Sequence, residues 1–275
     1  MGLLARKGFS YYNRHAFDFL LTLFLSTLVD YICKPPEVRI NLNKTMENAR
    51  NVTTIESLSL HGDVVIHCRN TNDTMFSWDV STVDNTNKQF LPFITLADNV
   101  KKITIGPRKL SLGFHYIRFV AEMRREEGTR AYDYGYIRIV LPDLEPIVSG
   151  PSSIVKGSGL MVLNGEKSFD PNVDGPSRYQ GLNFTWYCRR ENEDYSNISS
   201  LPVNLPMGRS RDKGGCFGLG PGRLSTRTKQ LILDPAEMKA KLHYVVDLVV
   251  NKGERTSRFG SHRFYVISAL QFFIK

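Results

Sequence analysis

The sequence lacks the patterns by which most enzymes and metal sites are recognised. It has four cysteines, and no CxxC or HxxxH spacing accompanies them, which disfavours a zinc-type site. It also has no G-x-S-x-G, HExxH or paired Cys/His nucleophile pattern. We therefore expect a protein that is not an enzyme, with no catalytic residue, metal or cofactor.

The chain also has no apolar run long enough to cross a membrane as a helix. Residues 19–29 are apolar, but such a run is much shorter than the roughly 20 residues that a span needs. Because Arg6, Lys7 and Arg14 precede it, residues 1–34 are assigned to an N-terminal apolar segment of the signal-peptide type. The alternative is a strand from a truncated start, since no A-x-A site follows. Residues 264–275 also end in apolar sequence, so both ends indicate a piece of something longer.

A helical stripe with a period of 3.6 residues is missing from the body of the chain. Short runs rich in Val, Ile, Phe, Tyr and Trp are bounded instead by Gly, Asn, Asp and Pro, as in strands and turns. The predicted strands are residues 63–68, 75–80, 114–121, 134–141, 159–163, 182–188, 230–233, 242–250 and 263–267. A small helix is predicted for residues 235–241, with Asp234 as N-cap. Strands this short and this closely spaced indicate a β-sandwich.

Two stretches of the chain repeat one pattern. Pro107 and Tyr116 have the same spacing as Pro235 and Tyr244, and in both copies a His directly precedes the Tyr and a strand-like run follows. We expect the two Tyr strands to superpose. The chain is therefore predicted to hold two copies of one module.

The two tryptophans occupy equivalent places upstream of these Tyr strands. The segment from Trp186 to the second Tyr is longer than that from Trp78 to the first, so the second copy carries an inserted Gly-rich loop with Cys216. Proline is concentrated between the copies, at residues 142–151. We predict two tandem immunoglobulin/fibronectin type III-like β-sandwiches, residues 35–145 and 146–275, the second with the Cys-containing loop.

Parity along the second Trp strand predicts its buried face. Leu182, Phe184, Trp186 and Cys188 share one side, and the residues between them share the other. The first side is apolar and is expected to face the core. The second is expected to face water.

The cysteine positions predict a disulfide that tethers the inserted loop. Cys188 ends the Trp strand and Cys216 lies inside the inserted loop, so a bridge between them would tether that loop. Cys33 and Cys68 are left as a second pair. The alternative for Cys68 is a small buried hydrophobe on an inward strand face.

Five N-glycosylation sequons point to the secretory pathway. They are Asn43-Lys-Thr, Asn51-Val-Thr, Asn72-Asp-Thr, Asn183-Phe-Thr and Asn197-Ile-Ser. Asn183 falls on the side of its strand that is expected to face solvent, where a glycan can be accommodated.

One motif in the second copy carries a resemblance to a known family. The sequence SFDPNVDGPSRYQGLNFTWYC resembles the S-x-D-P-[DN]…L-x-[FY]-x-W-x-C signature of receptor-for-egg-jelly (REJ) modules from polycystin-type proteins. The matching residues are Ser168, Asp170, Pro171, Asn172, Leu182, Phe184, Trp186 and Cys188. Weaker similarity extends over residues 60–267. Related PKD sandwiches continue from the Trp as W-D-F-G-D-G, which this chain lacks, and that departure favours REJ.

The resemblance implies an extracellular, glycosylated array of fibronectin-like sandwiches in a large membrane protein. On that basis we expect a non-enzymatic ectodomain segment with a structural, adhesive or ligand-binding role on the extracellular side of the plasma membrane. Membrane association would then come from other parts of the parent protein. The alternative is a free-standing secreted β-sandwich protein that binds a ligand by itself.

Two further patterns have a chemical and a structural interpretation. Asp170, Asn172 and Asp174 with Gly175 spell the opening of a calcium loop, but the twelfth position is Gly181 rather than Glu, so a structural turn is favoured. The glycines of residues 214–222 follow no strand, open no helix and lack a Gly-Lys-Ser/Thr ending. A flexible loop is therefore favoured over a phosphate cradle.

The formal net charge of +9 raises the question of an anionic partner. The basic residues gather in and around the inserted loop: Arg189, Arg190, Arg209, Arg211, Lys213, Arg223 and Arg227. Without an RRM, OB or helix-turn-helix pattern, nucleic acid is not expected. A protein or glycan ligand is expected instead, and the basic loop would meet anionic glycans or acidic ectodomains. The alternative without a binding role is a solvated loop that keeps the protein soluble.

Overall fold

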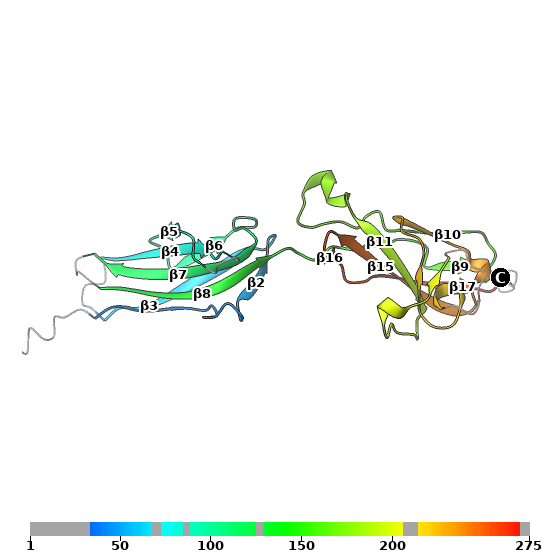
Figure 1. Ribbon diagram of the computed structural model, residues 1–275, viewed down its shortest axis with the longest axis horizontal. Helices are drawn as coiled ribbons and strands as arrows, with labels where there is room; N and C mark the ends of the chain where they lie inside the picture. The colour runs from blue at the N-terminus through cyan, green and yellow to red at the C-terminus, as the bar shows by residue number, and fades with distance from the viewer. Residues whose placement is uncertain (1–33, 68–72, 85–88, 125–128, 206–213, 270–275) are drawn as a thin grey trace, which may run out of the picture. The chain divides into compact units, whose positions relative to one another are not determined.

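The computed structural model describes residues 34–67, 73–84, 89–124, 129–205 and 214–269, in two compact units of residues 1–140 and 141–275 (Figure 1). The regular elements of the described residues are strands and short 3-10 helices, so the predicted all-β class is confirmed. No described helix is long and apolar enough to cross a membrane. The predicted signal segment lies outside the described residues, except for residue 34.

Unit 1 is a sandwich of two sheets in which most neighbouring strands are antiparallel. Its strands are β1 (Glu37–Ile40), β2 (Arg50–Thr53), β3 (Leu58–Val65), β4 (Thr74–Thr82), β5 (Ile94–Asp98), β6 (Lys102–Ile105), β7 (Gly113–Met123) and β8 (Arg130–Val140). One sheet has the order β1-β3-β6 and the other β2-β8-β7-β4-β5, with β2 parallel to β8. Alternation along β3 and β7 sends every second side chain into the space between the sheets. The core there includes Trp78, Ile117 and Phe119, all fully buried.

Unit 2 has the same kind of architecture with one enlarged sheet. Its strands are β9 (Ser153–Val155), β10 (Met161–Asn164), β11 (Asn183–Arg190), β12 (Val203–Asn204), β13 (Gly222–Leu224), β14 (Gln230–Leu233), β15 (Leu242–Lys252), β16 (Arg255–Thr256) and β17 (Gly260–Ile267). The large sheet has the order β12-β13-β11-β15-β17-β9, with β16 on β15, and it faces the two-stranded sheet β10-β14. Four 3-10 helices lie between these strands: η1 (Gly175–Tyr179), η2 (Ile198–Ser200), η3 (Gly215–Phe217) and η4 (Pro235–Glu237).

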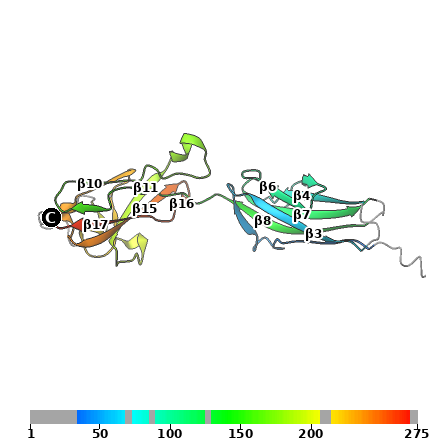
Figure 2. The same cartoon turned by 180° about the vertical axis from the view of Figure 1, so that it is seen from behind.

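The larger sheets of the two units share one strand order. From its parallel edge strand inward, unit 1 has β2-β8-β7-β4 and unit 2 has β9-β17-β15-β11 (Figures 1 and 2). The Trp strand pairs with the Tyr strand in both. The order is that of immunoglobulin/fibronectin type III-like sandwiches.

Each buried tryptophan makes the same hydrogen bond. Trp78 Nε1 donates to the Val100 carbonyl at 3.1 Å, and Trp186 Nε1 donates to the Thr228 carbonyl at 2.9 Å. Val100 lies two residues before β6, and Thr228 lies two residues before β14. In both units the bond therefore ties the central strand of one sheet to the entry of a strand in the other.

The expected superposition of Tyr116 on Tyr244 is wrong by one residue. Trp78 lies opposite Phe119, whereas Trp186 lies opposite Leu248, so the position of Tyr244 corresponds to that of His115. Tyr244 and His115 both point into the core, and Tyr116 points outward. The shared His-Tyr dipeptide thus sits in two registers, and a one-residue slip exchanges the faces of a strand.

His115 and Tyr244 do the same structural work at the start of their strands. The Tyr244 hydroxyl accepts from Lys239 N at 3.1 Å, five residues upstream, in the manner of a tyrosine corner. His115 Nε2 lies 2.8 Å from the Ser111 carbonyl, four residues upstream. Burial lowers the pKa of His115, and the bond to Ser111 opposes that shift. A neutral imidazole in unit 1 thus takes the place of the phenol in unit 2.

The expected solvent face of the second Trp strand is also largely wrong. Phe184, Trp186 and Cys188 face the core as predicted, but Thr185 and Tyr187 on the other side are each only 7% exposed. Tyr195 and Phe259 cover that side, with ring centroids 5.8 and 5.6 Å from that of Tyr187. Parity predicts the two sides of a strand, but it does not predict what a distant loop adds to them.

The helix predicted for residues 235–241 is a single 3-10 turn. η4 covers Pro235–Glu237, and the Asp234 side chain accepts from Ala236 N at 2.9 Å, as an N-cap does. The turn stops early because Met238 is extended and buried in the core. The N-cap position was predicted correctly, whereas the length of the helix was not.

Candidate functional site

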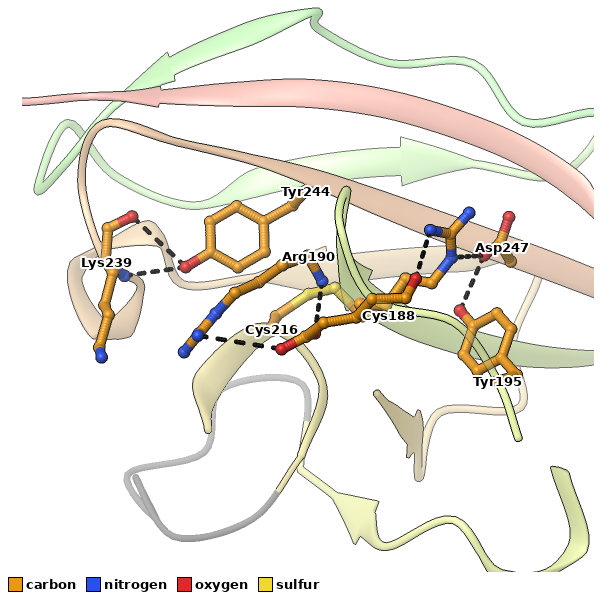
Figure 3. The surroundings of a disulfide bond; sticks show 9 residues. Cys188, Arg190, Tyr195, Cys216, Lys239, Tyr244 and Asp247 are labelled. Atoms are coloured by element: carbon orange, nitrogen blue, oxygen red, sulfur yellow. Dashed lines mark hydrogen bonds and ion pairs between the residues drawn. A yellow bond between two sulfur atoms is a disulfide. The ribbon is translucent and has the colours of Figure 1, made fainter. Parts of the chain in front are cut away.

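The disulfide of unit 2 joins its central sheet to the inserted loop. Cys188 on β11 and Cys216 on η3 are bonded across 28 residues, with their Cα atoms 5.3 Å apart. Both are buried, at 0% and 2% exposure. Figure 3 shows this bond with Arg190, Tyr244 and Lys239 to its left and with Asp247 and Tyr195 to its right. Cys33 and Cys68 lie outside the described residues.

Glycines let the backbone fold tightly around Cys216. A Cβ on Gly214 would lie 2.3 Å from the Pro221 carbonyl oxygen, and one on Gly222 would lie 2.7 Å from the Gly214 carbonyl carbon. Gly215 has φ +89°, a conformation that side chains disfavour. The described part of the Gly-rich run is therefore closely packed backbone rather than a flexible loop.

The insertion contributes apolar side chains to the core of unit 2. Phe217 is 5% exposed and Leu224 is 1% exposed, and both belong to the main cluster of unit 2. β13 pairs with β11, and β12 pairs with β13. The bridge therefore reinforces a loop that also has apolar anchors. Residues 206–213, with Arg209, Arg211 and Lys213, lie outside the described residues.

A cavity of about 160 Å³ opens beside the disulfide. Its lining combines the bridge, apolar side chains and charges: Lys156, Arg190, Cys216, Phe217, Gly218, Leu219, Glu237, Met238, Lys239 and Tyr244. Three of these residues are cationic and one is acidic. We call this space the basic cavity. Its size and its charge suit a single anionic group, such as a carboxylate or a sulfate.

Arg190 is the most enclosed cation of the basic cavity. Its side chain is 19% exposed, and Nη2 donates to the Gly218 carbonyl at 2.9 Å. Its Nε is buried and has no hydrogen-bond partner within the described part of the chain. Glu193 lies 3.9 Å from Nη1, which is a long ion pair. Arg190 therefore places a largely enclosed positive charge in the wall of the basic cavity, where it can attract an anionic group.

Tyr244 forms the inner wall of the basic cavity. Burial raises the pKa of its hydroxyl, while the bond from Lys239 N and the charge of Arg190 oppose that shift. The phenol therefore stays neutral at physiological pH. It can serve as a hydrogen-bond partner in the cavity but not as a base.

A second buried charge lies on the opposite face of the same sheet. The Asp247 side chain is 2% exposed and accepts from Tyr195 Oη at 2.7 Å, from Arg189 Nε at 3.3 Å and from the Ser261 hydroxyl. Burial raises the pKa of Tyr195, as does the adjacent Asp247 charge. The carboxylate is thus fully used in holding the loop of Tyr195 on the sheet.

The predicted turn at Asp170 is held by cations of its own unit. Arg255 donates to both carboxylate oxygens of Asp170, at 3.0 and 2.5 Å, and Lys252 Nζ lies at 3.1 Å. The Asn172 N–H donates to the same carboxylate at 3.0 Å. Arg255 also donates to the Pro142 carbonyl, so the motif fastens the first residues of unit 2 to the β15–β16 hairpin. Among the described residues, no cluster of His, Cys, Asp and Glu is arranged to hold a metal.

Four of the predicted sequons lie on exposed positions. Asn43, Asn51, Asn183 and Asn197 are exposed, and Asn72 lies outside the described residues. Asn197 is the N-cap of η2 and accepts from Ser199 N. Occupancy of all five stays a prediction.

A sequence profile of the REJ domain matches residues 62–269. The chain belongs to the REJ domain family. The match includes the Asp170 turn, the Trp strand and Cys188, so the resemblance predicted from that motif is confirmed.

Curated relatives of this REJ chain are much longer than it is. The polycystin family receptor for egg jelly of Homo sapiens is 24% identical over 251 residues, which cover 86% of this chain and 10% of that protein. The Mus musculus protein of the same name is 29% identical over 140 residues, or 50% of this chain and 6% of that protein. A prokaryotic cysteine/cysteine sulfinic acid decarboxylase is 24% identical over 155 residues, or 54% of this chain and 43% of that protein. The chain thus spans a tenth or less of the two receptors.

Two solved structures are similar at a lower level. Two fibronectin type III domains of chicken tenascin match with a TM-score of 0.30 and 13% identity, over 85% of this chain and 98% of theirs. Three N-terminal domains of the bacteriophage RB49 outer capsid protein Hoc match with a TM-score of 0.26 and 14% identity, over 85% and 71%. Both TM-scores are low, and the fold of each unit is defined by its own strand order.

Sequence reasoning missed most of the basic cavity. Arg190 was among the basic residues of the insertion, but Lys156 follows β9 and Lys239 follows η4, far from it in sequence. Only the strand pairing of β9 and β15 with β17 brings these segments together. No local signal in the sequence marks either lysine.

Removing the bridge should weaken unit 2 alone. We expect Cys216→Ser to lower the free energy of unfolding of unit 2 by about 3 to 4 kcal/mol, the cost of releasing a 28-residue loop in the chain-entropy model. Urea unfolding with and without a reductant measures this. The unit 1 transition is the internal control and should not move. Protease should cut residues 191–227 faster in the variant, and equal cutting rates would contradict the tethering role.

Acid should remove the contribution of Asp170. Burial disfavours its charged form, but the bonds from Arg255 and Lys252 prevail and lower the pKa to about 2. Because the folded pKa lies below the unfolded one, the stabilisation is complete above about pH 4 and is lost as the pH falls toward 2. It amounts to about 2 kcal/mol. We expect the stability gap between wild type and Asp170→Asn to close over this range. Asp143→Asn, at an exposed ion pair, should show no such closure, and a gap for Asp170→Asn that is constant with pH would contradict the assignment.

Proposed function

We propose that this chain is a structural and adhesive segment of the extracellular part of a polycystin-type membrane protein. The buried Cys188–Cys216 bridge within the REJ span is the observation that carries the proposal, because structural disulfides persist in oxidising compartments. Exposed sequons support the same location. No catalytic group is assigned, and the chain acts by its surfaces.

The module repeat is part of the proposal. The shared strand order and the matching tryptophan bonds support a sandwich module for residues 35–145 and a second for residues 146–275. Two modules in series suit a segment that links other parts of a long ectodomain, since each module has its own core.

Antibody access on intact cells tests the location. Cells that express the full parent protein should bind an antibody against this chain without permeabilisation, and non-reducing peptide mapping should recover the Cys188–Cys216 pair.

Beads coated with the secreted chain should adhere to cells, and Cys216→Ser beads should adhere less. Staining that requires permeabilisation would overturn the extracellular assignment. Adhesion equal to that of albumin-coated beads would overturn the adhesive role alone.

The basic cavity favours a second candidate, recognition of an anionic group on a glycan or an acidic ectodomain. Arg190, Lys156 and Lys239 line the same cavity, so three positive charges face one small space. A secreted protein with this cavity could bind such a group by itself. η3 and the bridge, which line the cavity, come from the insertion of unit 2.

Binding of a sulfated oligosaccharide tests this second function. We expect Lys156→Ala/Lys239→Ala to weaken binding about tenfold or more, because hydrogen bonds to charged groups contribute about 1.5 to 3 kcal/mol each. The matched control is Arg39→Ala/Arg258→Ala, which removes the same charge from side chains that are 80% and 92% exposed. Equal losses in the two variants would indicate nonspecific attraction to net charge. Calorimetry at fixed salt, with the desulfated sugar as a blank, gives the affinities.

A further inference from the structure

The outer face of the larger sheet in unit 1 carries a cluster of rings, three of them exposed and three half-buried. They are Phe90, Phe93, Tyr116, Tyr132, Tyr134 and Tyr136, which we call the aromatic face. Tyr132 is 56% exposed, Phe90 49% and Phe93 41%. Exposed apolar surface that is contiguous in this way marks a site that something covers.

The rings form one continuous surface. The centroid of Tyr116 lies 5.0 Å from that of Phe90, 5.0 Å from that of Tyr134 and 5.4 Å from that of Tyr136. The Arg118 guanidinium lies 3.8 Å over the Phe93 ring. Rings held in this mutual geometry keep their faces and edges in fixed positions. The surface is therefore preformed.

The equivalent face of the larger sheet in unit 2 is covered by other parts of that unit. There Tyr195 and Phe259 cover Tyr187, and the face is buried by the chain itself. In unit 1 the aromatic face remains open among the described residues. Anything that covers this face therefore comes from outside those residues.

A sequon asparagine lies at the rim of the aromatic face. Asn43 is directly opposite Tyr136 in an antiparallel bridge, and Tyr136 N donates to the Asn43 carbonyl at 2.8 Å. Residues that face each other in such a bridge have side chains on the same side of the sheet, about 5 Å apart. The preceding residue, Leu42, is buried in the core, so Asn43 alternates outward and is exposed. Its Cβ therefore leaves the strand on the same face as the rings, and its Nδ2, the atom that would carry a glycan, donates one of its two hydrogens to the Asn48 carbonyl.

The chemistry of a sugar matches this surface. A pyranose ring presents C–H bonds on its face, and aromatic faces are electron-rich, so the two pack against each other in water. Asn43-Lys44-Thr45 is a sequon in an exposed loop, which fits attachment of an N-linked glycan. We propose that Asn43 carries an N-linked glycan whose first N-acetylglucosamine residues pack over Tyr136 and Tyr116 and cover the aromatic face. The inference rests on the extracellular location proposed above.

A second sequon supplies the matched control. Asn51 on β2 lies opposite Arg138, two residues farther along β8, and it too is exposed on this side of the sheet. A glycan there starts beside a charged side chain instead of a ring. Asn51→Gln should therefore remove a glycan without uncovering the aromatic face.

The test is a double-mutant cycle on the full chain secreted from mammalian cells. Thr45→Ala, which abolishes the sequon but keeps Asn43, and Asn51→Gln are each combined with Tyr136→Ser. Glycopeptide mass spectrometry gives the occupancy of each site, and thermal unfolding gives the midpoint of the unit 1 transition. NMR of the glycan reports ring-current shifts of the sugar protons.

We expect Asn43 to be occupied and Thr45→Ala to lower the unit 1 midpoint by a few degrees. The same change in the Tyr136→Ser background should have no effect, and the upfield shifts of the first sugar should vanish with Tyr136. Asn51→Gln should leave the midpoint unchanged in both backgrounds. Enzymatic removal of the glycan from the wild type should reproduce the Thr45→Ala result, which excludes an effect of the Thr45 side chain itself.

Three results would overturn the proposal, each in its own way. An empty Asn43 beside an occupied Asn51 or Asn183 refutes the Asn43 site and leaves the extracellular function intact. An occupied Asn43 with unshifted sugar protons, and with equal midpoint losses in both backgrounds, refutes the packing on the rings. A chain that is not secreted, or that carries no glycan at any sequon, refutes the extracellular function and this inference together.

Discussion

The indole N–H of a buried tryptophan is the contact on which each unit depends. Trp78 and Trp186 are completely buried, so each must find an acceptor inside the protein, and each finds it in the loop that enters the opposite sheet. One hydrogen bond thereby ties a strand of one sheet to the place where a strand of the other begins. The rest of the sandwich packs around a ring that can occupy only this position.

This constraint explains what the sequence could reveal about the fold. The tryptophans, the apolar parity of the second Trp strand and the turn at Asp170 are local patterns, so the core strands, the sandwich class and the REJ motif were predictable. The Cys188–Cys216 pair also followed from position, because one cysteine ends a core strand and the other sits in an insertion. The strand pattern and the Asp170 motif can each be recognised within a short stretch of sequence, and the disulfide can be inferred from the positions of two cysteines.

The failures arise where distant segments meet. His115 rather than Tyr116 is the counterpart of Tyr244. The inward-facing residue at this position must hydrogen-bond the backbone of an upstream turn, and both the imidazole of a His and the hydroxyl of a Tyr can do so. The basic cavity was not predictable, since Lys156 and Lys239 reach Arg190 only through strands that pair across the sheet. Periodicity specifies which way a side chain points, but only the completed topology specifies its neighbours.

Each unit has an ion pair between its Trp strand and the neighbouring strand, although the residues that form it differ. In unit 1, Asp79 on β4 meets Arg118 on β7 at 2.9 Å, and in unit 2, Arg189 on β11 meets Asp247 on β15 at 3.3 Å. The acid and the base have exchanged strands, yet both pairs bridge the Trp strand and its partner on the outer face. An isolated buried carboxylate would be strongly destabilising, so each unit retains a cation beside it. What the module needs at this place is therefore a neutralised pair that clamps its two central strands, and either polarity provides it.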